Sequence, residues 1–197
     1  MPKKHVFLFN GPPGSGKDFI THKVVKSFWF RGQALKFAAP LKRGTQAFYG
    51  LTKKQFQALD TYEKKKLPAD EFLGLTPREP QIGMSEIYAK TLHGQDVFGR
   101  LALREMLKHR FKTVFCFSDC GFPVEVNFLI QACKELDYEV TLIRIHREGY
   151  TYEGDSRNYV YVDPAGPYCP SFDVYNDGTD DFVRNVKALI HERIERT

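Results

Sequence analysis

The chain has 197 residues and a net charge of +5, with 42% apolar and 14% aromatic residues. This length predicts a single domain, and this composition can build a hydrophobic core, which excludes an intrinsically disordered chain. No apolar run approaches the roughly 20 residues that a membrane-spanning helix requires, so no membrane partner is expected. The charge permits contact with nucleic acid without demanding it, because DNA-binding proteins usually concentrate basic residues on one face.

Apolar runs alternate with helical patterns along the chain. Residues 4–10 (KHVFLFN) lead straight into a glycine-rich turn, so we expect a buried strand there rather than a signal peptide. Residues 16–30 then have helical spacing. Further strands are predicted at 33–40, 112–119, 138–147 and 171–179, and further helices at 41–51, 123–136 and 180–194. This order predicts an α/β fold, a five-stranded parallel sheet with helices on both faces and ligands beyond the carboxyl ends of the strands.

Two segments fall outside this alternation. Residues 52–110 are polar and then helical, and we expect a helical insertion within the single domain. The motif TPRE predicts a capping box there, with Thr76 as the N-cap and Glu79 reaching back to it, although Pro80 argues for an irregular start. Residues 146–170 are rich in Gly, Tyr, Pro and charge, which is typical of a mobile loop and predicts a small lid.

The cysteines and histidines show no metal-binding spacing. The sequence has no C-x-x-C pair and no matching pair of histidines, so buried, reduced thiols are favoured over a zinc site. Reduced thiols indicate a cytoplasmic compartment. The four cysteines are Cys116, Cys120, Cys133 and Cys169.

Residues 11–18 (GPPGSGKD) follow the phosphate-loop pattern G-x-x-x-x-G-K-[ST] at every position but the last. The glycines let backbone N–H groups turn toward phosphate oxygens, and Lys17 would place its charge on the β and γ oxygens of ATP. Asp18 stands where a hydroxyl usually helps to hold Mg²⁺, and its carboxylate can bind that ion directly or through water. We therefore expect ATP and Mg²⁺ to bind at Gly11, Pro12, Pro13, Gly14, Ser15, Gly16, Lys17 and Asp18.

Several motifs, in this order, resemble a known family. GPPGSGKD, LKFAAPLKRGTQAFYGL, TPRE, a strand ending in SD, IRIHREG and DVYNDGTDDFVRNVKALI resemble the bacteriophage deoxynucleoside monophosphate kinases, which also carry Asp after the loop lysine. Related phage enzymes, the 5-hydroxymethyluracil DNA kinases, phosphorylate the hydroxymethyl group of a base within DNA during thymidine hypermodification. The resemblance implies a P-loop kinase fold and an ATP-dependent phosphotransferase in the host cytoplasm. It also implies that residues 52–110 lie on the acceptor side.

One departure from this resemblance bears on the acceptor. In the monophosphate kinases the third strand runs into Asp-x-Arg, whereas this chain has Asp119, Cys120 and Gly121. A bidentate guanidinium suits a free 5′-monophosphate, so the missing arginine favours a neutral hydroxyl as acceptor. Together with the positive charge, this favours the hydroxymethyl group of 5-hydroxymethyluracil in phage DNA.

Two alternatives remain open at this stage. The first is a deoxynucleoside monophosphate kinase that makes a diphosphate from a free dNMP. Its acceptor contacts would come from Arg78, Arg100, Arg104, Glu125 or the lysines at 64–66. The second is a nucleotide-binding regulator or NTPase that uses the loop only as a switch. The oligomeric state is not predicted.

Catalytic candidates follow from their places beside predicted strands. Asp119, after the third predicted strand, is a candidate metal ligand or proton acceptor, with an N-cap of the following helix as the alternative. Arg147 and Arg157, in the predicted lid, are candidates to neutralise the transferring phosphoryl group. Arg144 either faces solvent or pairs with an acid.

Other residues have two interpretations each. Glu125 points either into the cleft or to solvent. Tyr150, Tyr152 and Tyr159 either stack on a base or pack within the loop. Residues 176–179 (NDGT) either hold adenine through backbone groups or form a turn that caps the last helix.

Overall fold

The computed structural model describes residues 2–61, 63–162 and 169–196. The chain divides into two compact units. The first comprises Met1–Phe37 and Gly99–Thr197, and the second is Ala38–Phe98.

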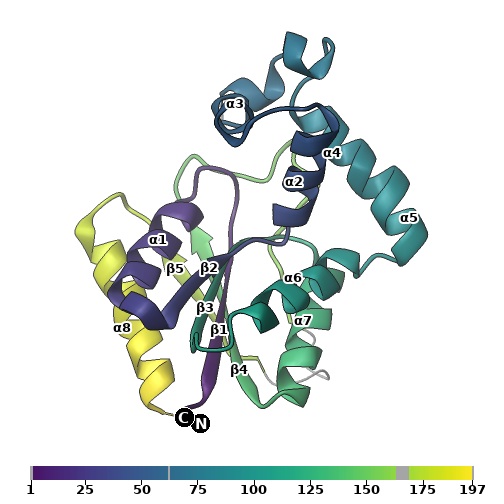
Figure 1. Ribbon diagram of the computed structural model, residues 1–197. Helices are drawn as coiled ribbons and strands as arrows, with labels where there is room; N and C mark the ends of the chain where they lie inside the picture. The colour runs from purple at the N-terminus through teal and green to yellow at the C-terminus, as the bar shows by residue number, and fades with distance from the viewer. Residues whose placement is uncertain (1, 62, 163–168, 197) are drawn as a thin grey trace. The chain divides into compact units, whose positions relative to one another are not determined.

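The first unit is built on a parallel sheet, which in the described residues has five strands in the order β2-β3-β1-β4-β5 (Figure 1). β1 lies in the middle and pairs in parallel with β3 on one side and β4 on the other. This arrangement confirms the predicted α/β fold with a five-stranded parallel sheet. The strands are β1 (Lys4–Asn10), β2 (Gly32–Leu35), β3 (Val114–Cys120), β4 (Tyr138–His146) and β5 (Ser171–Tyr175).

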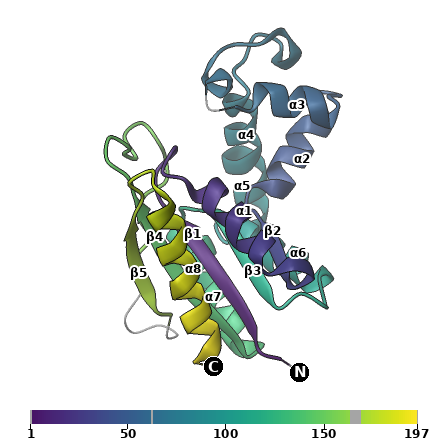
Figure 2. The ribbon, with the colours of Figure 1, turned by 90° about the vertical axis from the view of Figure 1, so that its left-hand side faces the viewer.

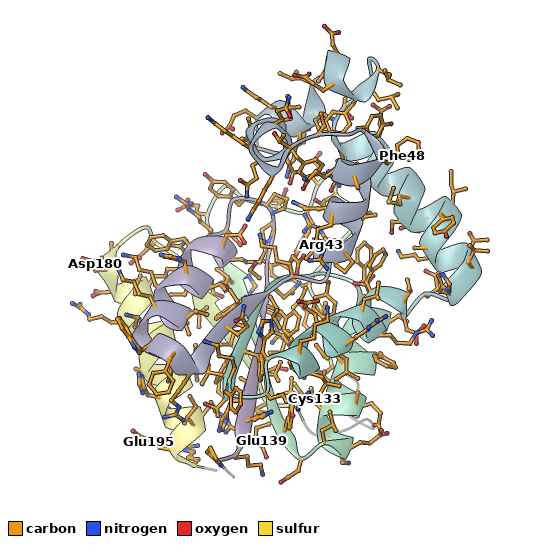
Figure 3. All side chains as sticks on the ribbon, in the orientation of Figure 1. Arg43, Phe48, Cys133, Glu139, Asp180 and Glu195 are labelled. Atoms are coloured by element: carbon orange, nitrogen blue, oxygen red, sulfur yellow. The ribbon has the colours of Figure 1, made fainter. Side chains whose placement is uncertain are left out.

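Helices cover both faces of this sheet. α1 (Lys17–Ser27) and α8 (Asp180–Glu195) lie side by side on one face, as Figure 2 shows. α6 (Val97–Lys108) and α7 (Pro123–Glu135) lie on the other face, where α7 packs against β4. Figure 3 labels Asp180 and Glu195 at the two ends of α8, and Cys133 on α7. All four cysteines are buried thiols.

The core follows from the alternation of side chains along the strands. Phe7 and Phe9 of β1 point to the face that α1 and α8 cover, where they pack with Ile20, Val24 and Val186. Val6 and Leu8 are fully buried as well. Val6, Phe7, Leu8 and Phe9 of the central strand are buried on both faces, so this stretch is continuously apolar instead of alternating.

The second unit, Ala38–Phe98, is helical. Phe72 forms its aromatic centre, with ring centroids 4.9 Å from Tyr49 and 6.2 Å from Phe56. Its helices are α2 (Ala39–Phe48), α3 (Lys53–Leu59), α4 (Arg78–Gly83) and α5 (Lys90–His93), joined by 3₁₀ turns at Lys64–Lys66 and Asp70–Phe72 and by a π-helical turn at Met84–Ala89.

The predicted capping box is confirmed. The Glu79 N–H donates to Thr76 Oγ1 at 3.3 Å, and the Thr76 N–H donates to Glu79 Oε2 at 2.7 Å. Pro80 lies within α4, where its missing N–H costs nothing because first-turn donors have no partner inside a helix. A second capping box, between Thr52 and Gln55 at the start of α3, was not predicted.

Several predicted boundaries were wrong by a few residues. The strand expected at 33–40 ends at Leu35, because Pro40 belongs to the first turn of α2 rather than to the end of a strand. The helix expected at 16–30 ends at Ser27. Trp29 then adopts a φ of 45°, which a right-handed helix does not permit.

Residues 147–162 of the predicted lid contain no helix or strand. Residues 163–168, which belong to the same predicted segment, lie outside the described residues. Within the described ranges, no helix combines the length and the apolar character that a membrane span requires.

We expect Phe7→Ala to lower the free energy of unfolding by about 3–5 kcal/mol, because it removes a buried ring from the central strand and leaves a cavity. Urea denaturation followed by circular dichroism measures the change. Phe111→Ala is the matched control, since Phe111 is 93% exposed, and it should change stability by less than about 0.5 kcal/mol. Equal effects of the two substitutions would contradict this placement of the core.

Candidate active site

The loop between β1 and α1 is shaped by its glycines. Gly14 and Gly16 have φ angles of 83° and 100°, in the left-handed region that favours glycine. Space demands glycine there as well. A Cβ on Gly14 would lie 2.2 Å from Cε1 of Tyr150, and one on Gly16 would lie 2.4 Å from Nδ2 of Asn176. The loop is therefore a closed turn whose backbone leads directly into the N-terminus of α1, which attracts anions.

Lys17 lies inside this loop, with 8% of its surface exposed. Its Nζ donates to the carbonyl oxygens of Gly11 at 2.5 Å and Pro12 at 2.7 Å. Burial and, to a smaller extent, the nearby charge of Arg157 lower the pKa of Lys17 to about 8. An anion bound at the loop would favour the protonated ammonium.

Asp18 faces two partners that the sequence did not reveal. Its Oδ1 accepts from Ser118 Oγ at 2.7 Å and lies 2.6 Å from Nζ of Lys36, the residue after β2. Shielding from water would by itself raise the pKa of Asp18, but Lys36 and Ser118 outweigh this effect and lower it. The carboxylate is therefore ionised at neutral pH and already attracts a cation.

A β-bulge sets the direction of Ser118 and Asp119. Leu8 pairs with Phe117 but Asn10 pairs with Cys120, so two residues of β3 lie opposite Phe9 alone. The side chain of Asp119 accepts from the Phe37 N–H at 2.9 Å. Asp119 does not cap the following helix, because the N-cap of α7 is Phe122, so that alternative was wrong.

Asn10, at the end of β1, was missed by the sequence analysis. Its side chain is fully buried, and its Nδ2 donates to Cys120 O at 2.9 Å, Tyr152 Oη at 2.9 Å and Asn158 O at 3.1 Å. Its Oδ1 accepts from the Val160 N–H at 2.9 Å. One amide thus joins the ends of β1 and β3 to residues 152–160. A polar residue that ends an apolar strand was the available signal.

The two lid arginines make different contacts. Arg147 donates from Nη1 to Gly14 O at 2.9 Å, and its guanidinium lies 4.6 Å from the ring centre of Tyr150. Arg157 makes a bidentate pair with Asp155, at 2.9 Å from Nε and 2.8 Å from Nη2. The structure therefore brings both arginines to the same unit as the loop, one of them in direct contact with it.

Residues 176–179 support the loop and cap the last helix. Asn176 Nδ2 donates to Ser15 O at 2.8 Å, and Thr179 Oγ1 accepts from the Asp181 N–H at 3.2 Å as the N-cap of α8. The turn interpretation is thus confirmed for Thr179. Arg144 pairs bidentately with Asp173, which confirms the second of its two alternatives.

Two of the three candidate tyrosines pack against each other, and the acceptor candidates Glu125 and Arg104 differ in exposure. Tyr152 and Tyr159 pack within the loop, with ring centroids 5.2 Å apart in an edge-on arrangement. Glu125 is 4% exposed on α7, so the prediction that it could face solvent was wrong. Arg104 is exposed on α6.

The remaining acceptor candidates are Arg100, which lies on α6, Arg78, which begins α4 in the second unit, and the lysines 64–66, which form a 3₁₀ turn in that unit.

The residues around the loop fit Mg²⁺. In the described part of the chain no group of three or more His, Cys, Asp or Glu side chains could hold a metal by itself. Mg²⁺ needs fewer protein ligands, because it keeps several waters and takes further oxygens from phosphates. The Asp18 carboxylate already pairs with a cation, the ammonium group of Lys36. Asp119 is the second carboxylate candidate. These two would hold the ion, which when bound neutralises polyphosphate charge and orients the polyphosphate.

Comparison with known proteins shows the fold. No protein-family model matches this sequence, and no curated protein matches it. A candidate kinase of Chloroflexus aurantiacus is similar over 100% of this chain and 98% of its own, with a TM-score of 0.54 and 11% identity. The protein APE1195 is similar over 98% of this chain and 98% of its own, with a TM-score of 0.51 and 14% identity.

An APS kinase of Mycobacterium tuberculosis covers 97% of this chain and 99% of its own, at 12% identity and a TM-score of 0.48. The candidate kinase of Chloroflexus aurantiacus and APE1195, with TM-scores above 0.5, show that the chain shares their α/β fold.

We expect the affinity of the loop for a nucleotide triphosphate to fall as the pH rises above about 8. The bound anion favours protonated Lys17, so its pKa is higher in the complex, and affinity is lost between the free and the bound pKa. The loss should approach about tenfold per pH unit at most. Calorimetric titration with a non-hydrolysable ATP analogue from pH 7.5 to 9.5 measures it. A constant affinity across this range would contradict the lowered pKa.

Proposed function

We propose that the protein is an ATP- and Mg²⁺-dependent phosphotransferase that acts on a deoxynucleotide. The observation that carries the proposal is the closed glycine loop at residues 11–17 around the buried ammonium of Lys17. Such a loop at a helix N-terminus presents N–H groups and a positive charge to phosphate oxygens. The fold shared with a candidate kinase supports the same class of reaction.

In the proposed reaction an acceptor oxygen forms a bond to the γ-phosphorus of ATP while the bond to the β,γ-bridging oxygen breaks, which leaves ADP. Lys17 and Arg147, which both contact the loop, would hold the phosphates. If the acceptor is a hydroxyl group and Asp18 alone holds the metal ion, the Asp119 carboxylate would instead accept the hydroxyl proton. The charge that develops on the transferred group would be neutralised by Lys17 and Arg157.

Our preferred acceptor is the hydroxymethyl group of 5-hydroxymethyluracil within DNA. A neutral hydroxyl does not need the arginine that this chain lacks at Gly121, and the net charge of +5 suits a DNA substrate.

A free deoxynucleoside monophosphate is the second candidate, and one specific observation favours it. The stem of Arg157 lies over Gly121, so a guanidinium reaches this end of β3 from the lid. A phosphate-bearing acceptor would then meet a bidentate donor after all.

We expect the purified protein to transfer label from γ-labelled ATP to DNA that contains 5-hydroxymethyluracil. The same experiment offers, in separate reactions, DNA with thymine only, a panel of free dNMPs, and no acceptor. Label on free dNMPs alone would contradict the DNA acceptor and favour the deoxynucleoside monophosphate kinase. Phosphate released without an acceptor would favour an NTPase, and bound but unspent ATP would favour a regulator.

Lys17→Ala should reduce this transfer about 10²-fold or more, because it removes the charge inside the loop. Lys23→Ala is the matched control, since Lys23 is an exposed lysine on the same helix. Both variants should keep the circular dichroism spectrum of the parent protein. Near-normal transfer by Lys17→Ala would contradict the role of the loop.

Asp18→Asn should weaken binding of Mn²⁺ together with a non-hydrolysable ATP analogue about tenfold or more, because it removes a charged oxygen ligand while keeping the side chain's shape. Electron paramagnetic resonance measures free Mn²⁺ without any turnover. Asp181→Asn, at the exposed start of α8, is the control and should leave Mn²⁺ binding unchanged. Equal Mn²⁺ binding by the Asp18→Asn and Asp181→Asn variants would contradict the role of Asp18 as a metal ligand.

A further inference from the structure

Gly121 is a glycine because the side chain of Arg157 crosses it. A Cβ at Gly121 would lie 2.7 Å from each of Cβ, Cγ and Cδ of Arg157. The backbone itself does not require glycine, because the φ of Gly121 lies outside the left-handed region. The atoms in the way belong to the stem near the backbone rather than to the flexible end. A side chain at 121 and the arginine at 157 therefore compete for one space.

Asp155 holds the other end of this arginine. Its carboxylate accepts from Nε and Nη2 of Arg157 at 2.9 and 2.8 Å, and from the Arg157 backbone N–H at 3.0 Å. The Asp155 side chain is 3% exposed, and that of Arg157 is 23% exposed. A bidentate pair that is this well shielded fixes the plane of the guanidinium.

Backbone contacts fix the segment that carries both residues. The Asn158 N–H donates to Gly121 O at 3.3 Å, so the chain next to Arg157 follows the end of β3. The Asn10 amide bonds both Cys120 O and Asn158 O. Arg157 is therefore anchored at its backbone, along its stem and at its head.

The anchored guanidinium lies close to the centre of the site. Arg157 crosses Gly121, which directly follows β3, and the loop that carries Lys17 follows β1, the parallel neighbour of β3. The pKa of Lys17 is lowered by burial and then by the charge of Arg157. The pKa of Arg157 is raised first by Asp155 and to a smaller extent by Asp119. The three charged groups Lys17, Asp119 and Arg157 thus gather where the carboxyl ends of β1 and β3 meet.

We propose that Gly121 and Asp155 are positioning residues that hold the Arg157 guanidinium beside Lys17, where it neutralises the transferred phosphoryl group. Gly121 leaves room for the stem, and Asp155 sets the orientation of the head. This inference rests on the proposed function for its catalytic consequence but not for its geometry. Neither residue touches the substrate in this proposal.

The decisive experiment compares four variants: Gly121→Ala, Asp155→Asn, Arg157→Gly, and the exchange variant Gly121→Arg with Arg157→Gly. The exchange lets an arginine stem start from position 121 in the space that residue 157 has left. Gly32→Ala is the matched control, because a Cβ there would lie 2.8 Å from Val25 O, and Gly32 pairs with Val114 at the start of β3, away from the strand end that Gly121 follows. Thermal unfolding checks that each variant is folded.

We expect Gly121→Ala and Asp155→Asn to lower kcat about 10²-fold while KM for ATP changes by less than about threefold, because a catalytic group is misplaced and the loop is intact. The exchange variant should recover at least about tenfold in kcat over Arg157→Gly alone. Gly32→Ala should lose stability without losing turnover. A general loss of packing would not produce this split or this recovery.

A second measurement does not depend on catalysis. Protein labelled with ¹⁵N in arginine reports the Nε–H group of Arg157 by NMR, assigned by its absence in Arg157→Gly. This group donates to Asp155, so displacing the guanidinium should shift its resonance in Gly121→Ala and leave it unchanged in Gly32→Ala.

The inference is overturned if Gly121→Ala keeps both the kcat and the Arg157 Nε–H resonance of the parent protein, or if the exchange variant is folded and recovers nothing. Absence of transfer by the parent protein to every acceptor would instead refute the proposed function. In that case the Arg157 resonance still decides whether Gly121 positions Arg157.

Discussion

The candidate site depends on one buried amide. Asn10 ends the central strand, and its side chain bonds both the end of β3 and the backbone at residues 158 and 160. A buried amide whose groups were left without partners would cost about 1–3 kcal/mol per group, so these contacts are strongly specified. They bring three segments that are far apart in the chain to the place where the glycine loop begins. The Asn158 N–H, which donates to Gly121 O, and Tyr159 Oη, which donates to Ile145 O, add to this attachment of residues 152–160 to the strand ends.

Charge inside the site is balanced by neighbours of opposite sign. Lys36 forms an ion pair with Asp18, and Asp155 forms one with Arg157. The Lys17 ammonium donates to backbone carbonyl oxygens. An isolated ion would be costly at the buried side chains of Lys17 and Asp155, and their partners reduce this cost, whereas Asp18 and Lys36 are exposed. The same pairing suits a site that receives a polyanion with a divalent cation. In the proposed function, a bound phosphate would replace the carbonyl oxygens as the partner of Lys17. A metal ion would replace Lys36 as the partner of the Asp18 carboxylate.

In the proposed function, the carboxylate at position 18 is an alternative to the hydroxyl that the loop pattern expects there. The hydroxyl that the pattern expects at this position is absent, but Ser118 brings a hydroxyl group to within 2.7 Å of Asp18 from the neighbouring strand. The bulge opposite Phe9 makes this possible, because it turns Ser118 and Asp119 out of the regular alternation of β3. A carboxylate and a hydroxyl therefore lie together where a simple loop has the hydroxyl alone.

The sequence by itself determined the five strands, the helices that follow them and the glycine loop with Lys17. These features depend on local periodicity and on backbone conformations that few residues adopt. Pro40 was ambiguous locally, since proline ends a strand as readily as it begins a helix. Only the tertiary structure decided that Asn10 joins the strand ends, that Lys36 faces Asp18, and that Gly121 makes room for Arg157. Those relations connect residues separated by 18 to 150 positions, and no local pattern encodes which distant side chain will fill a given space.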